Sequence, residues 1–213
     1  MTALIECGLW RGAPLVLASK SQARARMLEN AGIPFKARDS KLDERNIAGI
    51  DELNASAQAG RLALEKARLV SRECPGRVVV GADQTLDLSG RVLHKATSVG
   101  EAICQLRAMA GSTHRLTSAV CCVRDNEILF EILDAAEIRM RRLSEESLHA
   151  YARSMGDRIL STVGGYELEG LGVNLIESVI GDMFTVMGLP ILQLLTKLRA
   201  IGMIGEEGEV ECS

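Results

Sequence analysis

The feature that most constrains the fold of this chain is the apolar segment RVVVGADQTL, at residues 77–86. Its consecutive valines predict a buried β-strand, which we expect to end in Ala82, Asp83 and Gln84. A carboxylate is costly to remove from water unless it meets a cation, binds a metal ion or acts as a base. The segment therefore predicts a functional site around Asp83.

Short strands and amphipathic helices are expected to alternate around this segment. Two of the helices begin at serine N-caps, Ser21 and Ser144. A hairpin turned at Asp125-Asn126 interrupts the alternation, which favours a mixed sheet in an α/β fold. The further predicted strands are 15–19, 33–38, 115–124 and 127–140, and the predicted helices are 21–31, 51–74, 97–110, 144–155 and 191–201.

Length and composition are those of one folded, soluble domain. The chain has 213 residues, 47% of them apolar and 25% charged, and no tract is biased enough to predict disorder. A net charge of −3 argues against duplex nucleic acid as a partner. Because the sequence has no signal peptide and no apolar run of about 18 residues, we expect a cytoplasmic protein without a membrane partner.

The six cysteines are scattered, without a C-x-x-C pair or a cluster with histidine. This spacing favours reduced thiols over disulfides or a zinc site. Cys121 and Cys122 are adjacent within a predicted strand. Because successive strand residues point to opposite faces, we expect one of these two thiols to be buried and the other to be exposed or at an interface.

A candidate phosphate site follows the first predicted strand, where Ser19-Lys20-Ser21 leads into a helix that carries Arg24 and Arg26. Backbone N–H groups at a helix N-terminus are unpaired and favour an anion. Serine and arginine side chains add donors for phosphate oxygens. The pattern by itself also suits an ordinary serine cap with solvated arginines.

Other charged residues have two interpretations each. Lys95 could pair with Asp83 and hold a phosphate, or be a solvated loop residue. Lys66 on the long helix could likewise be functional or a solvated surface residue. The pair Asp43-Glu44 could bind a divalent cation or lie in a surface loop. The three histidines are dispersed and no serine lies in a G-x-S-x-G turn, which argues against zinc catalysis and a hydrolase triad. Together these residues indicate an enzyme that acts on a small phosphate-bearing molecule.

Several ordered motifs carry a resemblance to a known family. They are LASKSQARARMLENAGIPF at 17–35, DE at 43–44, VVVGADQ at 78–84, GRVLHK at 90–95, GGYELEGLG at 164–172 and GDMFTVMGLP at 181–190. In this order the chain closely resembles the Maf family of nucleoside triphosphate pyrophosphatases over nearly its whole length. The resemblance implies a catalytic domain at 14–202, between an N-terminal extension at 1–13 and an acidic tail at 203–213.

The resemblance also implies an activity and a fold. The expected reaction is hydrolysis of a nucleoside triphosphate between the α and β phosphates, giving the monophosphate and pyrophosphate, with a divalent cation, Mg²⁺ or Mn²⁺. The expected architecture is like that of inosine triphosphate pyrophosphatases, a curved mixed sheet with flanking helices and a cleft between two lobes, often in a homodimer. A non-catalytic nucleotide-binding regulator of cell division is an alternative that the family's older name suggests.

Site residues follow from the resemblance by position. Asp83 matches the proton acceptor, Glu44 an acidic residue linked to metal or water, and Ser19 and Arg24 the phosphate contacts of the first motif. Two lysines match residues that line the family's cleft, Lys66 and Lys95. The resemblance also bears on the nucleotide base. Gln84 and Glu169 are similar to the residues at these positions in the branch that acts on 7-methyl-GTP, rather than to those of the branch that prefers dTTP and UTP.

Overall fold

A seven-stranded mixed sheet forms the centre of the computed structural model, which describes residues 3–205. The strand order is β2-β1-β3-β5-β6-β7, with β4 paired to β3. β1 is parallel to β2 and β3, whereas the other pairs are antiparallel, so the predicted mixed sheet is confirmed. The strands are β1 Leu15–Ala18, β2 Phe35–Ala37, β3 Val79–Leu88, β4 Arg91–Leu93, β5 Thr113–Arg124, β6 Glu127–Met140 and β7 Ile176–Ile180.

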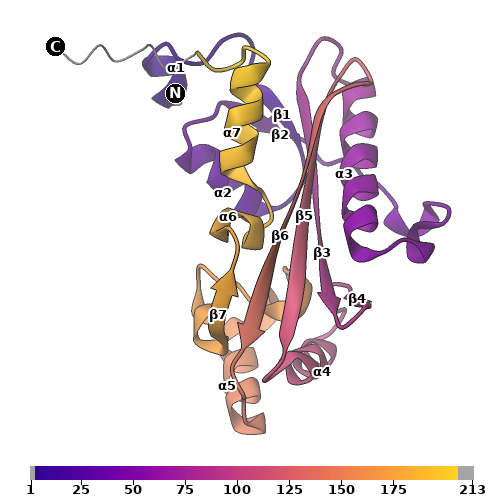
Figure 1. Cartoon of the computed structure of the whole chain (residues 1–213), viewed down its shortest axis with the longest axis vertical. Helices are drawn as coiled ribbons and strands as arrows, with labels where there is room; N and C mark the ends of the chain where they lie inside the picture. Colours follow the sequence, from indigo (N-terminus) through magenta and orange to yellow (C-terminus); the bar gives the residue numbers. More distant parts are fainter. Residues whose placement is uncertain (1–2, 206–213) are drawn as a thin grey trace.

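Helices cover the sheet in two groups, one towards each end of the long strands (Figure 1). α3 packs on one face of β3 and β5, and α2 and α7 contribute to an apolar cluster on the other face. α4 and α5 belong to a third apolar cluster, around the beginning of β5 and the end of β6. These are the two expected lobes. The helices are α1 Ala3–Glu6, α2 Gln22–Asn30, α3 Ala55–Arg72, α4 Val99–Met109, α5 Glu145–Met155, α6 Met183–Val186 and α7 Ile191–Ala200.

A gap in the pairing of β3 separates the lobes. On one edge, β3 pairs with β1 at 79–81 and with β4 at 86–88, which leaves 82–85 without a strand partner on that edge among the described residues. On the other edge, β5 pairs with β3 from 79 to 87. The prediction that Asp83 ends its strand is therefore wrong, because β3 continues to Leu88 and forms a hairpin with β4. Asp83 lies instead in the gap of the ladder.

Glycine at position 81 allows the long helix to lie directly on β3. A Cβ atom there would be 2.1 Å from the carbonyl oxygen of Ala63 and 2.7 Å from the amide nitrogen of Ala67, both in α3. These distances are far below van der Waals contact. The close approach brings the middle of α3, which carries Lys66, over the next outward residue on that face of β3, Asp83.

Local signals predicted most elements well, with some errors at their ends. Ser21 and Ser144 are the N-caps of α2 and α5, and Asp125 and Asn126 have the positive φ angles of a tight hairpin turn. The long helix begins at Ala55 rather than at residue 51, because the Asn54 side chain accepts a hydrogen bond from Ala57 N and caps it. α1, α6, β4 and β7, each of five residues or fewer, were not predicted.

The expectation for the cysteine pair is half right. Cys121 and Cys122 point to opposite faces of β5, into different apolar clusters, but both are buried. Neither is exposed because helices cover both faces of the sheet at this point. At the C-terminus, Met203 and Ile204 are buried, and residues 206–213 of the predicted acidic tail lie outside the described residues.

Candidate active site

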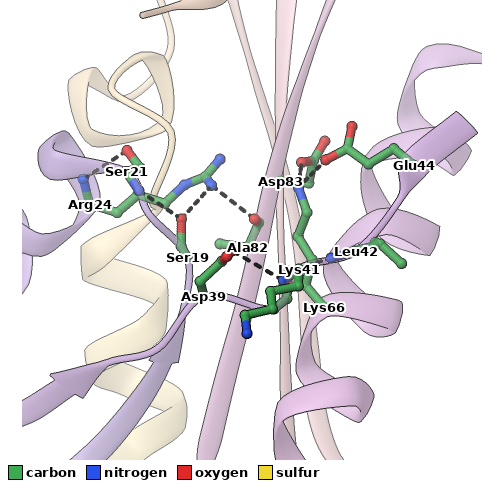
Figure 2. A network of polar contacts seen from close by, with 11 residues as sticks. Ser19, Ser21, Arg24, Asp39, Lys41, Leu42, Glu44, Lys66, Ala82 and Asp83 are labelled. Atoms are coloured by element: carbon green, nitrogen blue, oxygen red, sulfur yellow. Dashed lines mark hydrogen bonds and ion pairs between the residues drawn. The ribbon is translucent and has the colours of Figure 1, made fainter.

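An open cleft runs along the unpaired part of β3 and contains seven of the eight predicted site residues. Arg24, Lys66 and Asp83 line it, and so do Glu44 and Lys95. Ser19 and Gln84 also line it. The structure therefore brings together residues from 19 to 95 of the chain, and Figure 2 shows the cations of α2 and α3 on either side of Ala82 and Asp83.

Arg24 ties three separate segments together at one end of the cleft. Its Nη1 atom donates to the carbonyl oxygen of Ala82 at 2.9 Å and to Ser19 Oγ at 3.3 Å, and its Nε atom donates to the carbonyl oxygen of Gly188 at 2.8 Å. Ala82 O is available because that edge of β3 has no strand partner. Ser21 caps the helix through its contact with Arg24 N. The guanidinium is thus fixed beside the helix N-terminus, where backbone dipoles favour an anion.

Two carboxylates converge on a single ammonium group at the centre of the cleft (Figure 2). Lys66 Nζ lies 2.5 Å from Asp83 Oδ1 and 2.7 Å from Glu44 Oε1. Asp83 is only 8% exposed, whereas the Glu44 side chain is 51% exposed. Each carboxylate keeps a second oxygen. The two carboxylates could therefore share a cation or orient a water molecule while both remain paired with Lys66.

The surroundings of Asp83 shift its acidity in a defined direction. Burial raises the pKa of the Asp83 carboxyl above its usual value, against the opposing attraction of Lys66 and Arg24. Glu44 raises the pKa further through repulsion between the two carboxylates. A carboxylate with a raised pKa is a stronger base, which suits proton transfer from water near neutral pH.

Lys95 is the alternative partner that the sequence suggested for Asp83, and the structure assigns that contact to Lys66 instead. The reason is that Asp83 faces α3, which carries Lys66, whereas Lys95 lies in the segment after β4. Partial burial and the neighbouring cations Arg24 and Lys66 lower the pKa of the Lys95 ammonium. Such clustered cations predict that an anion is attracted to the cleft.

Glu169 lies apart from the other predicted residues, in a small side pocket that adjoins the cleft. Gln84 and Ala23 line both the cleft and the side pocket, and Leu116 lines only the pocket. Apolar walls with a few polar groups are typical of a site for a planar ring. Gln84 and Glu169 both line this side pocket.

The loop that carries Glu169 is held by buried contacts. Tyr166 OH lies 2.7 Å from His114 Nε2, and Tyr151 OH donates to the carbonyl oxygen of Gly165 at 3.2 Å. A Cβ atom on Gly172 would lie 2.5 Å from the carbonyl oxygen of Glu167. The glycine-rich motif at 164–172 therefore folds into a close-packed loop that supports the side pocket.

Sequence reasoning missed two residues that shape the site, Asp39 and Gly188. Asp39 pairs at 2.9 Å with Lys20 of the predicted phosphate site, and both residues line the cleft. The backbone oxygen of Gly188 orients Arg24, although no side chain at that position could have signalled it. The motif at 181–190 was the available clue, since a conspicuous Gly-Leu-Pro turn lies within it.

The arrangement defines a class of protein, an α/β enzyme whose cleft contains clustered cationic side chains and a buried carboxylate. Within residues 3–205, no group of three or more His, Cys, Asp and Glu side chains is arranged to hold a metal ion. Over the same residues no helix is long and apolar enough to cross a membrane.

Comparison with known proteins identifies the family. Residues 14–201 match the Maf-like protein family, and the chain belongs to it. A nucleoside triphosphate pyrophosphatase of Rhodopseudomonas palustris is 49% identical over 194 residues, 90% of this chain and 96% of the relative. One from Nitrobacter winogradskyi is 45% identical with the same coverage. A 7-methyl-GTP pyrophosphatase of Rhizobium etli is 44% identical, over 89% of this chain and 97% of the relative.

Proposed function

We propose that this protein is a nucleoside triphosphate pyrophosphatase, which hydrolyses the bond between the α and β phosphates to give a monophosphate and pyrophosphate. The observation that carries the proposal is the buried Asp83 carboxylate in the gap of β3, paired with Lys66 and next to the Ala82 carbonyl oxygen that binds Arg24. The names of the similar proteins support the same activity.

The chemical step requires a base and stabilisation of negative charge. Asp83 accepts a proton from a water molecule as the water oxygen attacks the α phosphorus, and pyrophosphate leaves with the electrons of the broken P–O bond. Arg24, Ser19 and the N-terminus of α2 stabilise charge on the phosphates. Lys95 and Lys66 add positive charge on the other side of the cleft.

A divalent cation, Mg²⁺ or Mn²⁺, fits the residues at the centre of this cleft. Mg²⁺ is commonly held by one or two carboxylates together with substrate phosphates and water. Asp83 and Glu44 supply two carboxylates that already meet at one cationic nitrogen. When bound, the cation would neutralise charge on the triphosphate.

The side pocket is the proposed base site, and it favours 7-methyl-GTP as the second, more specific candidate. Gln84 lines it together with Glu169, whose carboxylate accepts hydrogen bonds and attracts positive charge. A guanine edge offers adjacent N–H donors, and methylation at N7 makes the ring cationic. The similarity to a 7-methyl-GTP pyrophosphatase supports this candidate.

The test is pyrophosphate release from GTP, 7-methyl-GTP, dTTP, UTP, CTP, ITP and 5-methyl-UTP, with Mg²⁺ or Mn²⁺ or without metal. We expect Asp83→Asn to lower turnover by about 10²–10⁴-fold and to retain nucleotide binding in calorimetry, because the shape is kept. Asp87→Asn, on the same strand but outside the cleft, is the matched control. Binding without pyrophosphate release by the native protein would favour the regulator instead.

We also propose a homodimer that acts in the cytoplasm, where nucleoside triphosphates are available. Exposed apolar side chains on the last two strands of the sheet, Leu133 and Ile180, support an interface at this side. Light scattering of the purified protein tests the dimer. A single monomeric species at micromolar concentration would contradict it.

A further inference from the structure

Gln84 is held in one orientation by acceptors on a segment far away in the sequence. Its Nε2 atom lies 2.9 Å from the carbonyl oxygens of both Thr185 and Val186, and 3.1 Å from Ser118 Oγ. Turning the amide over would place its oxygen against two carbonyl oxygens, which cannot donate. The nitrogen must therefore face α6.

The oxygen of the same amide lies close to Gly188, a residue that lines the cleft. A Cβ atom built on Gly188 would lie 3.6 Å from Gln84 Oε1 and 3.6 Å from Arg24 Nε, so this oxygen lies beside the cleft wall. Gln84 lines both the cleft and the side pocket. The locked amide therefore offers an acceptor, and not a donor, to a bound ring.

Thr185 forms hydrogen bonds with two residues that face each other on adjacent strands. Ser118 of β5 and Asp134 of β6 are direct neighbours in the sheet. Ser118 Oγ donates to the carbonyl oxygen of Thr185 at 2.8 Å, and Thr185 Oγ1 donates to Asp134 Oδ2 at 2.5 Å. Thr185 is completely buried. Both its main chain and its side chain are thus fixed to the sheet.

We propose that Asp134 and Thr185 are positioning residues for base selection, which hold α6 so that the Gln84 amide presents its oxygen to the base. Neither residue lines the cleft or the side pocket, so each acts through Gln84. The inference rests on the proposed function, in which Gln84 contacts the base. It adds two residues that no contact with substrate would reveal.

The same α6 segment is followed by Gly188, which orients Arg24, so a displaced segment would also weaken phosphate binding. That effect is shared by every nucleoside triphosphate, because all carry the same phosphates. An effect transmitted through Gln84 depends on the base. The ratio of kcat/KM between the best and the poorest accepted nucleotide therefore isolates the proposed role.

The experiment measures this ratio by pyrophosphate release in the full-length protein. We expect Asp134→Ala and Thr185→Val to lower it by about 10-fold, the effect of losing a buried hydrogen bond. Asp134→Asn keeps an oxygen acceptor and Thr185→Ser keeps the hydroxyl, so both should retain the native ratio within about threefold. Glu131→Ala, an exposed change on β6, is the matched control.

A double variant gives an independent readout. If Asp134 acts through Gln84, then adding Asp134→Ala to Gln84→Met should cause no further loss of the ratio, because the effects of residues in one network are not additive. Asp134 is only partly buried, whereas Thr185 is completely buried. If Thr185→Val does not fold, Asp134→Ala can still be used for the test.

The outcomes separate this inference from the proposed function. A native ratio in both Asp134→Ala and Thr185→Val, with a reduced ratio in Gln84→Met, would overturn the positioning role and leave the activity standing. A native ratio in Gln84→Met would overturn base contact by Gln84, and the positioning role with it. Absence of pyrophosphate release by the native protein would overturn both the function and the inference.

Discussion

Lys66 Nζ lies 2.5 Å from Asp83 Oδ1, so the base proposed for catalysis is paired with a cation before any substrate binds. Lys66 lowers the pKa of the Asp83 carboxyl, which burial raises. Replacing Lys66 by methionine removes that attraction. The pKa of Asp83 should then rise further, because burial is no longer opposed by Lys66, and the active carboxylate form should need a higher pH.

The measurement is the acidic limb of kcat/KM against pH, which reports groups of the free enzyme. Its midpoint should move to higher pH in Lys66→Met and stay near the native value in Lys66→Arg, which keeps the charge. Lower activity alone would not decide the matter, because Lys66 also lines the cleft. An unchanged midpoint in Lys66→Met would contradict the coupling.

Two glycines of neighbouring elements should respond oppositely to alanine. At Gly81 an added Cβ would lie 2.1 Å from the carbonyl oxygen of Ala63, so Gly81→Ala must push α3 off the sheet and should destabilise by about 3 kcal/mol or more. At Gly60, within α3, nothing lies within 4 Å of the added atom. Gly60→Ala should stabilise by up to about 1 kcal/mol through helix propensity. Urea unfolding measures both, and equal effects would contradict the packing described.

His114 should make stability depend on pH. Burial lowers the pKa of this imidazole to about 4, below the value of about 6.5 for an unfolded chain. As the pH falls through 6.5, the unfolded state takes up the proton first, so stability that is complete above pH 6.5 is lost progressively towards pH 4. The loss is at most about 3 kcal/mol.

Urea unfolding of the native protein and of His114→Gln at several values between pH 7.5 and pH 4.5 tests this dependence. Glutamine can still bond to the Tyr166 hydroxyl but does not titrate. The difference in unfolding free energy between the two proteins should therefore change across the window. Parallel curves would show that His114 does not contribute.

The cysteines should differ sharply in reactivity. Burial raises the pKa of both the Cys121 and the Cys122 thiols to about 12, and neither is accessible. Cys7 and Cys104 are exposed. Iodoacetamide at pH 7.5 should label the exposed pair in the native protein and the buried pair only after denaturation, because the thiolate is the reacting form. Peptide mass spectrometry reads each site, and rapid native labelling of Cys122 would contradict its burial.

Much of the local structure and most of the site could be predicted, for reasons that particular residues show. Ser21 and Ser144 cap helices through contacts three residues away, and the Asp125-Asn126 turn depends on its own backbone angles. Such contacts are visible in a short window. Asp83 was recognisable because a carboxylate follows a run of valines.

The partners of these residues were not predictable in the same way. Choosing Lys66 over Lys95 as the ion-pair partner of Asp83 required the position of α3 on β3, which Gly81 permits. Thr185 contacts Gln84 from 101 residues away through a backbone oxygen, and any residue type has that atom. A sequence pattern has no signal for such a contact.

The sequence by itself therefore determined most of the long strands, the caps, the hairpin and the charged groups available for chemistry, since these depend on neighbours along the chain. The tertiary structure decided which edge of β3 stays unpaired, which lysine meets Asp83 and which way the Gln84 amide faces. These depend on the burial of apolar faces against one another, a property of the whole packed chain. The cleft exists because β1 and β4 pair with different parts of the same strand.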